Sequence, residues 1–325
     1  MKKIFFEPIK HSNHFIEINK RALKNIGYEP IQLSLKSIVS NLGKRTPIVL
    51  NWVEDQPYRK DIGKLKAFLI TVKFLVLICI SPLFSSKRVW IKHNFKPHNS
   101  AGNLLYYNII CAFLNFFKFE KVYLESYLGG ESIIHPLYLT DEELSIKVND
   151  VDSYLNTKSK SKKALFFGAV KKYKGLHTLL EDWPPEIELT IRGKCGDLEY
   201  ASDLMQIIKR RKLNATWING FVTDSELKSL LECSDFVILP HEDESMISSG
   251  TFYHAISYGC NILTKRSQFS LAKSELHSFV NVVDFSKLTP LYLQDIYIDR
   301  SRVVVGALAN YSRTNLQSCW AKIID

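Results

Sequence analysis

The chain has 325 residues, of which 46% are hydrophobic and 23% are charged, so it is long and apolar enough for two folded domains and is not disordered throughout. Its six cysteines are scattered without a Cys-x-x-Cys pair, which argues against a zinc ribbon or a disulfide framework and favours a reducing compartment. The net charge of +10 lies in one half: residues 1–163 hold 25 Lys and Arg against 14 Asp and Glu, whereas residues 164–325 hold 18 against 19.

The N-terminal half alternates short apolar runs with helical segments, and its first ten residues have too short an apolar run for a signal peptide. Strands are predicted at 2–7, 46–53 and 87–92, and helices at 15–26, 60–84 and 104–119. Strands that alternate with helices are typical of βαβ units in a parallel sheet.

The polar segment 150–163 has the composition of a linker, and the strand pattern starts again after it. Strands are predicted at 164–170, 187–192, 216–219, 236–239 and 261–264, with helices at 176–181, 200–212, 224–233 and 250–258 and a last helix at 301–321. We therefore expect an α/β protein with two Rossmann-like, doubly wound domains, residues 1–155 and 156–325.

Residues 67–84 form an apolar segment of 18 residues, which is close to the length of a transmembrane helix. It is interpreted as a buried crossover helix, a helix at the membrane interface, or a true span. A span is disfavoured because strands of one sheet precede and follow the segment. Basic residues flank it at Arg59, Lys60, Lys64, Lys66, Lys87 and Arg88, which favours an anionic lipid surface over nucleic acid as the partner of the basic half.

A strand opens into a glycine- and lysine-containing loop at residues 164–176, ALFFGAVKKYKGL. Backbone N–H groups and a helix N-terminus attract an anion, and Lys171 and Lys174 add positive charge around Gly168. The loop is predicted to hold phosphate, although a solvated basic turn would have the same composition.

A second motif occupies residues 236–264, where an apolar strand ends at Pro240 and the run Ser248, Ser249, Gly250, Thr251 opens a helix. In a parallel sheet the carboxyl ends of the strands form the ligand crevice, so this helix start is expected near the first loop. Two such helix starts on one sheet indicate a diphosphate, although plain capping of a structural helix is the alternative.

The two motifs, in this order and at this separation, resemble the C-terminal domain of a GT-B-fold glycosyltransferase. They are most similar to the broad family 4 ("glycosyl transferases group 1"), in particular its bacterial polysaccharide and glycolipid enzymes. The segment 89–98, VWIKHNFKPH, resembles the His-Asn segment that these enzymes place opposite the donor sugar. The resemblance implies an acceptor- and membrane-facing domain (1–155) and a donor-binding domain (156–325) facing a cleft, with the last helix packing back on the N-terminal domain.

The resemblance also implies roles for particular residues. The donor is expected to contact Gly168, Lys171, Lys174, Val222, Ser248, Ser249, Gly250 and Thr251. His93 is assigned to the donor sugar. Apart from the resemblance, an inverting enzyme needs a base near the acceptor hydroxyl, and the candidates in the same domain are His14 in the first loop and Glu54 or Asp55 at the end of the second strand. His11 and Asn13, in the first loop, are expected to contact the acceptor.

The chain departs from the family pattern at three positions. Family 4 enzymes usually carry two glutamates eight residues apart, where this chain has Met246 and His254, and an Arg after the loop glycine, where it has Ala169. Inverting and retaining chemistry therefore both stay open. We expect no metal and no cofactor besides the nucleotide-diphosphate sugar, because lysines and helix N-termini can stabilise a diphosphate leaving group and the acidic residues 242–244 lack the strand context of a metal site.

The function predicted from the sequence is transfer of a sugar from a nucleotide-sugar donor to a lipid-linked or polysaccharide acceptor. The expected location is the cytoplasm, peripheral on the inner face of the plasma membrane. The predicted partners are the nucleotide sugar, the lipid-linked saccharide or glycan acceptor and an anionic membrane surface, without nucleic acid. Two alternatives are another nucleotide-sugar enzyme of the same fold, such as an epimerase, and a non-catalytic sugar-nucleotide or membrane-binding scaffold.

Overall fold

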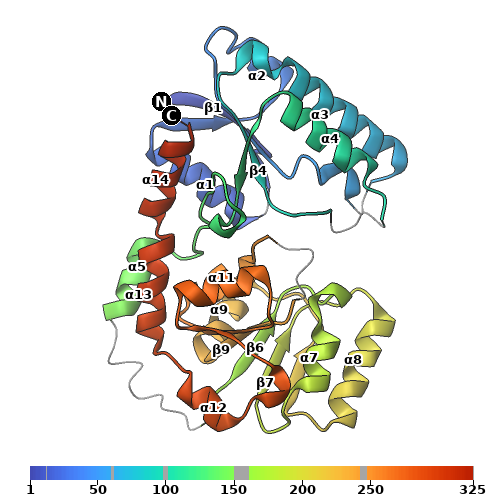
Figure 1. The fold of residues 1–325 in the computed structure, drawn as a ribbon, viewed down its shortest axis with the longest axis vertical. Coiled ribbons are helices and arrows are strands. Elements are labelled where there is room, and N and C mark those ends of the chain that lie inside the picture. The colour runs from blue at the N-terminus through green and yellow to red at the C-terminus, as the bar shows by residue number, and fades with distance from the viewer. Residues whose placement is uncertain (12, 60–61, 98–101, 150–160, 242–246, 325) are drawn as a thin grey trace. The chain divides into compact units, whose positions relative to one another are not determined.

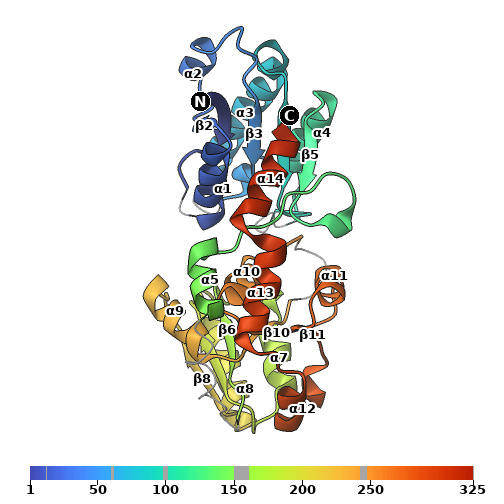
Figure 2. The same cartoon turned by 90° about the vertical axis from the view of Figure 1, so that its left-hand side faces the viewer.

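The computed structural model describes the chain except for residues 12, 60–61, 98–101, 150–160, 242–246 and 325. The chain forms two compact units, each with its own parallel sheet (Figures 1 and 2). The first unit comprises Met1–Pro136, Glu244–Ser248 and Arg313–Asp325, and the second comprises Leu137–Asp243 and Ser249–Ser312. The domain boundary expected at 155/156 lies outside the described residues.

The first unit has a five-stranded sheet in which the described neighbours are all parallel. Its strands are β1 (Lys2–Glu7), β2 (Tyr28–Ile31), β3 (Ile48–Asn51), β4 (Arg88–Lys92) and β5 (Glu120–Tyr123), in the order β2-β1-β3-β4-β5. Its helices are α1 (His14–Asn25), α2 (Leu35–Val39), α3 (Lys64–Phe84), α4 (Leu105–Phe116) and α14 (Arg313–Ile324). One hydrophobic core joins the sheet to α1 and α14, and another joins it to α2, α3 and α4.

The C-terminal helix belongs to the first unit, where it packs on α1. The indole Nε1 of Trp320 donates a hydrogen bond to the buried Oδ1 of Asn19 at 2.7 Å. The last helix expected over 301–321 is in fact two helices, α13 (Arg300–Tyr311) and α14, because Ser312 between them has a non-helical backbone with ψ of 159°.

The second unit has a six-stranded parallel sheet in the order β11-β10-β9-β6-β7-β8. Its strands are β6 (Ala164–Phe167), β7 (Leu189–Arg192), β8 (Ala215–Ile218), β9 (Phe236–Leu239), β10 (Asn261–Thr264) and β11 (Val280–Val282). Its helices are α5 (Asp141–Asn149), α7 (Leu176–Asp182), α8 (Leu198–Arg210), α9 (Asp224–Cys233), α10 (Gly250–Ser257), α11 (Gln268–Leu276), α12 (Pro290–Asp295) and α13. The prediction of two doubly wound α/β domains is thereby confirmed.

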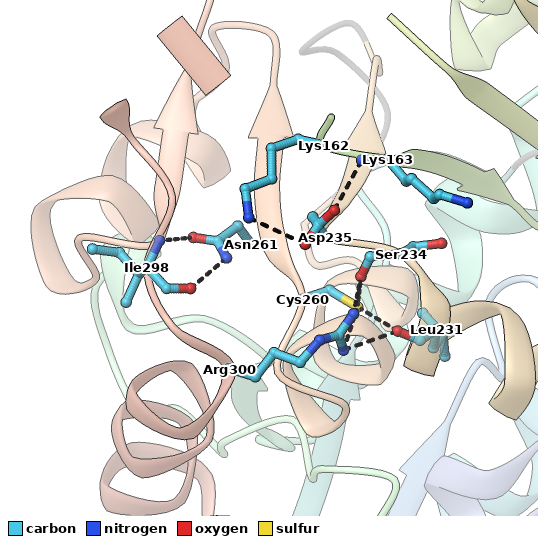
Figure 3. Close-up of polar contacts among 9 residues, drawn as sticks. All are labelled: Lys162, Lys163, Leu231, Ser234, Asp235, Cys260, Asn261, Ile298 and Arg300. Atoms are coloured by element: carbon cyan, nitrogen blue, oxygen red, sulfur yellow. Dashed lines mark hydrogen bonds and ion pairs between the residues drawn. The ribbon is translucent and has the colours of Figure 1, made fainter. Parts of the chain in front are cut away.

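Arg300 anchors the start of α13 to the amino ends of the central strands in the second unit (Figure 3). Its guanidinium donates to the carbonyl oxygens of Leu231 at 3.0 Å, Tyr258 at 2.9 Å and Ser234. Gly259 lies against it with a φ of +76°, and a Cβ there would be 2.9 Å from the Cβ of Arg300. The glycine is therefore required both by its left-handed backbone and by the close approach.

Helix α3 crosses over between β3 and β4, which are neighbours in the sheet. Its inner side chains, such as Phe74 and Ile78, lie in the core. Its other face exposes Leu65 (72%), Phe68 (50%), Leu69 (56%), Val72 (39%), Val76 (51%) and Leu83 (79%). Among the described residues, α3 is the one helix that is long and apolar enough, by length and composition, to cross a membrane. In the most apolar stretch of 18 residues within this helix, 39% is buried.

Candidate functional site

The strand order of the second sheet places its topological switch point between β6 and β9. From β6 the chain winds outward to β7 and β8, then returns to β9 on the other side of β6 and winds outward to β10 and β11. Ligands of open α/β sheets bind at the carboxyl ends of the strands where this reversal occurs. The loops that follow β6 and β9 contain the two motifs predicted from the sequence, so the fold brings both motifs to this switch point.

The loop after β6 is shaped by close backbone contacts. Gly168 has a φ of +106°, and a Cβ on Gly193, which follows β7, would overlap the carbonyl oxygen of Gly168. Gly175 is left-handed, and a Cβ there would lie 2.7 Å from the carbonyl oxygen of Pro240, at the end of β9. These glycines pack the loop against its neighbours, a structural requirement that the sequence alone did not indicate.

Lys174 is the half-buried cation of this loop. Burial and the nearby charge of Lys171 lower the pKa of Lys174 to about 8. No carboxylate of the described residues pairs with its ammonium group, although the Phe166 ring lies 5.9 Å away. Lys172, by contrast, is exposed and lies 3.4 Å from a carboxylate oxygen of Asp197. A desolvated lysine without a counterion is electrostatically suited to an anionic ligand.

His241 directly follows Pro240 and was missed by the sequence analysis. Its side chain is 8% exposed, and its Nδ1 is buried without a hydrogen-bond partner among the described residues. Burial, assisted by the charge of Lys174, lowers the pKa of His241 to about 3, so the imidazole is neutral at physiological pH. The sequence shows a histidine directly after the apolar strand 236–239. Only the fold shows that the end of this strand lies beside the lysine loop.

The helix start at α10 is divided between the two units. Ser249 is its N-cap, is 3% exposed and makes no side-chain capping bond, and Gly250 and Thr251 form the first turn. Ser248 belongs to the first unit, where its hydroxyl donates to Oε1 of the buried Glu125 at 2.5 Å. The donor-binding roles of these four residues stay predictions.

His254 occupies the position at which family 4 enzymes usually have the second glutamate. Its imidazole stacks on the ring of Tyr138, with centroids 4.0 Å apart and planes inclined by 5°, and meets Phe167 edge-on at 5.7 Å. The side chain is thus held by aromatic contacts within the second unit.

The segment of Val222, one of the predicted donor contacts, follows β8. Val222 is half-buried there, and the preceding Phe221 exposes 87% of its side chain. Asn219 fixes the start of the segment, since its Oδ1 accepts a hydrogen bond from the backbone N–H of Cys195 at 2.8 Å. An exposed phenylalanine ring at this edge can stack on a base, and the sequence analysis had named only Val222.

The first unit has its own switch point, between β1 and β3, and the candidate residues of its loops gather there. Trp52, just after β3, stacks on His93 with ring centroids 4.0 Å apart and on His11 at 5.4 Å. Phe15 lies edge-on to His93 at 5.1 Å. Trp52 has a φ of +54°, which is a strained backbone conformation for a bulky side chain.

His93 is neutral and held in one orientation. Asn51 donates through Nδ2 to the carbonyl oxygen of Glu7 at 3.2 Å, so its Oδ1 faces Nε2 of His93 at 3.1 Å and accepts that proton. Burial, with smaller contributions from the charges of His135, Lys92 and His11, lowers the pKa of His93 well below its usual value. A neutral imidazole with a fixed tautomer is suited to contact with a sugar hydroxyl more than to proton abstraction.

The first loop is tied to the start of α1. Asn13 is the N-cap of α1, and its Oδ1 accepts from the backbone N–H of Phe15 at 2.9 Å. The backbone N–H of Asn13 in turn donates to Nδ1 of His11 at 3.0 Å, and burial lowers the pKa of His11, assisted by Arg59. His14 is the exposed first residue of the helix. Acceptor contact by His11 and Asn13 and a base role for His14 stay predictions.

Glu54 is buried at 1% exposure and has a polar partner for each carboxylate oxygen. Trp90 donates from Nε1 to Oε2 at 3.1 Å, and the ammonium of Lys92 lies 3.5 Å from Oε1. Lys92 also donates to the hydroxyl of Tyr107, which donates to the carbonyl oxygen of Phe95 at 2.6 Å. Burial raises the pKa of Glu54 to about 7. These contacts fix the segment after β4, and the base role of Glu54 stays a prediction.

The described residues contain no group of three or more His, Cys, Asp or Glu side chains that could hold a metal ion. The acidic residues 242–244 lie outside the described part of the chain.

No family model matches the sequence, and no curated protein matches it significantly. Its likeness is to solved structures. HepE from Anabaena, in complex with UDP and glucose, has a TM-score of 0.61 at 13% identity, covering 99% of this chain and 98% of that one. AviGT4, a glycosyltransferase of avilamycin A biosynthesis, has a TM-score of 0.58 at 12% identity, with coverages of 99% and 96%. A glycosyltransferase from Rickettsia africae has a TM-score of 0.59 at 11% identity, with coverages of 99% and 97%.

These comparisons define the class of fold. The chain has the GT-B fold, with two parallel-sheet α/β domains and a C-terminal helix. The identities of 11–13% make this a likeness of fold. The specific assignment to family 4 stays a prediction.

Proposed function

We propose that this chain is a glycosyltransferase that takes a sugar from a nucleotide-diphosphate donor. The observation that carries the proposal is the half-buried Lys174, which pairs with no carboxylate of the described residues, near His241, whose buried Nδ1 has no hydrogen-bond partner among those residues, at the switch point of the second sheet. A lysine with a lowered pKa and a neutral histidine with a free ring nitrogen are both completed by the oxygens of a diphosphate. The structure of HepE with UDP and glucose, which has the same fold, supports this class of donor.

In the proposed reaction the acceptor hydroxyl oxygen attacks C1 of the donor sugar. The bond from C1 to the diphosphate oxygen breaks, and its electron pair stays on the leaving diphosphate. Lys174 and His241 stabilise this growing negative charge, together with the N–H groups of the first turn of α10 at Gly250 and Thr251. His93 contacts the sugar. The hydroxyl proton passes to a base near the acceptor if the enzyme inverts, and to an oxygen of the leaving diphosphate if it retains.

The leaving group is proposed to need no metal ion. Lysine, histidine and helix N–H groups place positive charge and donors where the diphosphate charge develops, which is the electrostatic role a divalent ion plays in other transferases. Measured turnover in excess chelator tests this directly. Complete loss that magnesium or manganese restores would contradict the metal-free reaction and direct attention to residues 242–244.

The acceptor is proposed to be lipid-linked or a growing polysaccharide at the cytoplasmic face of the membrane. Support comes from the first unit, where the exposed face of α3 carries apolar side chains from Leu65 to Leu83 and the chain around it is basic. An apolar face flanked by lysines and arginines is suited to the interface of an anionic bilayer. A helix whose two flanking strands are neighbours in one sheet is suited to lying on the bilayer and not to crossing it.

The first experiment is a panel of nucleoside diphosphates, with and without magnesium, tested for thermal stabilisation of the full chain. A ligand at 100 times its dissociation constant adds about 2.7 kcal/mol to the free energy of unfolding. The nucleotide that stabilises the chain then identifies the donor series for turnover assays with lipid-linked acceptors. Binding without transfer or donor hydrolysis would favour the scaffold alternative, and stabilisation by none of the nucleotides would contradict the proposal.

A further inference from the structure

A second basic site lies in the first unit, at the opposite edge of the sheet from the Trp52–His93 stack. A pocket of about 610 Å³ opens at the amino ends of the strands. Lys2 and Lys3 of β1 line it, together with Asn41, Lys44, Arg45 and Ser86 from the segments that lead into β3 and β4. Its volume lies within the range of small-molecule sites. The strands separate it from the carboxyl edge, so it is distinct from the site proposed for transfer.

The charge of this pocket is not neutralised within the described residues. None of the four cations Lys2, Lys3, Lys44 and Arg45 pairs with a carboxylate there. Glu29 follows the lining residue Tyr28, but its carboxylate forms an ion pair with Lys24, with Oε1 3.3 Å from Nζ. Four like charges around one concavity repel each other, and an anion in the concavity relieves the repulsion.

The backbone fixes two of the lining residues in place. Arg45 has a left-handed φ of +49°, and its carbonyl oxygen accepts a hydrogen bond from the hydroxyl of Ser86 at 2.9 Å. Asn41 is 2% exposed and donates through Nδ2 to the carbonyl oxygen of Ser37 at 2.7 Å. The Oδ1 of Asn41 is buried without a donor among the described residues. Because Asn41 lines the pocket, a hydroxyl group beside the anion of a ligand is the donor proposed for this acceptor.

Exposed aliphatic side chains surround the same segment. Leu35 and Val39 of α2 and Leu42, next to Asn41, are exposed by 69%, 65% and 56%. Helix α2 packs in the same core layer as α3, whose Leu83 is 79% exposed. A basic pocket bordered by exposed aliphatic residues is suited to a molecule with a phosphate head and an apolar tail.

We infer that the pocket lined by Lys2, Lys3, Asn41, Lys44 and Arg45 binds the phosphate of an anionic lipid headgroup that carries a free hydroxyl, such as a phosphatidylglycerol. Helix α3 lies on the bilayer through general apolar and electrostatic contacts, whereas this pocket holds one headgroup. The inference is independent of sugar transfer, because it concerns the opposite edge of the sheet and is measured with no donor present.

The test compares the Lys3→Gln/Lys44→Gln variant with Lys209→Gln/Lys228→Gln, which removes two exposed cations of the second unit and so changes the net charge equally. Vesicles of phosphatidylcholine with phosphatidylglycerol are sedimented with each protein. The pocket variant is expected to bind at least tenfold more weakly than wild type, and the control variant within twofold of it. Equal binding by the two variants would overturn the inference.

Soluble glycerol phosphate separates a pocket from diffuse charge and identifies the source of the phosphate. It is expected to compete with the vesicles at a concentration where potassium chloride of the same ionic strength does not, and to lose this effect in the pocket variant. Competition no better than that of the salt would overturn a discrete pocket. Binding of glycerol phosphate as tight as that of the lipid would support the phosphate pocket and overturn the assignment to a membrane headgroup.

Discussion

The ammonium of Lys174 lies 3.4 Å from the point at which a side chain on Gly168 would begin. The absence of a side chain at Gly168 thus leaves room for the half-buried ammonium of Lys174 at the end of β6. Burial of the cation costs stability in the free protein, because desolvation disfavours its charged form. A bound anion offsets this unfavourable free energy by pairing with the ammonium group. Lys174 should therefore destabilise the free protein and, at the same time, strengthen ligand binding.

Lys174→Met is therefore expected to raise the free energy of unfolding of the free protein by about 1–3 kcal/mol at pH 7. The same change should weaken nucleoside diphosphate binding at least tenfold, because a charge-assisted contact contributes about 1.5–3 kcal/mol. Denaturant unfolding and nucleotide titration measure the two effects. Lys172→Met is the control, since Lys172 is exposed and paired with Asp197. A parallel loss of stability and binding in Lys174→Met would contradict the argument.

The stability of the wild type should also depend on alkaline pH in a defined direction. Because the folded state lowers the pKa of Lys174 from 10.5 to about 8, the unfolded chain binds more protons between these values, and stability rises with pH across that window. The difference in unfolding free energy between wild type and Lys174→Met isolates this contribution. It should shrink as the pH is raised from 8 to 10.5.

His241→Gln tests the residue that lies beside the lysine loop. The orphaned Nδ1 is expected to donate to a diphosphate oxygen, so the variant should bind the nucleotide about tenfold more weakly. The stability of the variant should also depend less on acid pH than that of the wild type. In the wild type the folded state lowers the pKa of His241 from 6.5 to about 3. The corresponding contribution to the free energy of unfolding is therefore present above pH 6.5 and is lost as the pH falls toward 3. His277→Gln is the control, a buried histidine bonded to Tyr311 at 2.7 Å, and should lose stability without losing affinity.

The central strands could be predicted from the sequence because they are continuous apolar runs. β3, β6, β9 and β10 are buried along their whole length, and each had been predicted. Three edge strands were missed, namely β2, β5 and β11, because each has a neighbour on one side only and carries polar residues or a proline. A local pattern cannot identify a strand whose pairing partner supplies most of its stability.

The candidate site could be predicted only where its residues lie in loops that directly follow predicted strands. Gly168, Lys174 and His93 were named in this way, and their roles stay predictions. His241 and Trp52 were not predicted, because a single histidine or tryptophan forms no sequence motif. Only the tertiary fold shows that His241 lies near Lys174. It likewise shows that Trp52 stacks on the imidazoles of His11 and His93. Glu54 illustrates the converse case, because its sequence context did not indicate that Trp90 and Lys92 occupy both its oxygens.

The exposed face of α3 predicts membrane attachment. Leu65→Gln/Phe68→Gln should reduce binding to anionic vesicles at least tenfold, because burial of each side chain in the interface contributes about 1.5–3 kcal/mol. The two residues are 72% and 50% exposed, so the melting temperature should barely change. Leu198→Gln, at an 81% exposed leucine of α8, is the control. Unchanged vesicle binding by the α3 variant would contradict docking through this face.

Gly259→Ala tests the anchoring of α13. Alanine at a φ of +76° is strained, and its Cβ would lie 2.9 Å from the Cβ and the carbonyl oxygen of Arg300. Gly27→Ala provides the matched control, because Gly27 has a φ of +90° with no atom within 4 Å. The control should lose about 1–2 kcal/mol of unfolding free energy from backbone strain alone. Gly259→Ala should lose about 1–3 kcal/mol more from overpacking, and equal losses would mean that the neighbourhood of Arg300 relaxes freely.

The last prediction concerns His93, which lies in the first unit while the diphosphate site lies in the second. His93→Ala should lower turnover about 10²-fold, as expected for loss of a contact strengthened in the transition state. The thermal stabilisation by the nucleoside diphosphate should stay within twofold in affinity, because the imidazole is assigned to the sugar.

The pH profile distinguishes this role of His93 from a base. Since burial holds the pKa of His93 well below its usual value, the imidazole is neutral throughout the physiological range, and the wild-type rate should show no acid limb near pH 6.5 that originates from this residue. Turnover is measured from pH 5.5 to 8 for wild type, His93→Ala and His93→Gln, with the glutamine variant expected to recover part of the rate through its amide. An acid limb near 6.5 that disappears in His93→Ala would mean that His93 titrates during turnover, and would assign it the proton of the acceptor hydroxyl instead of the donor sugar.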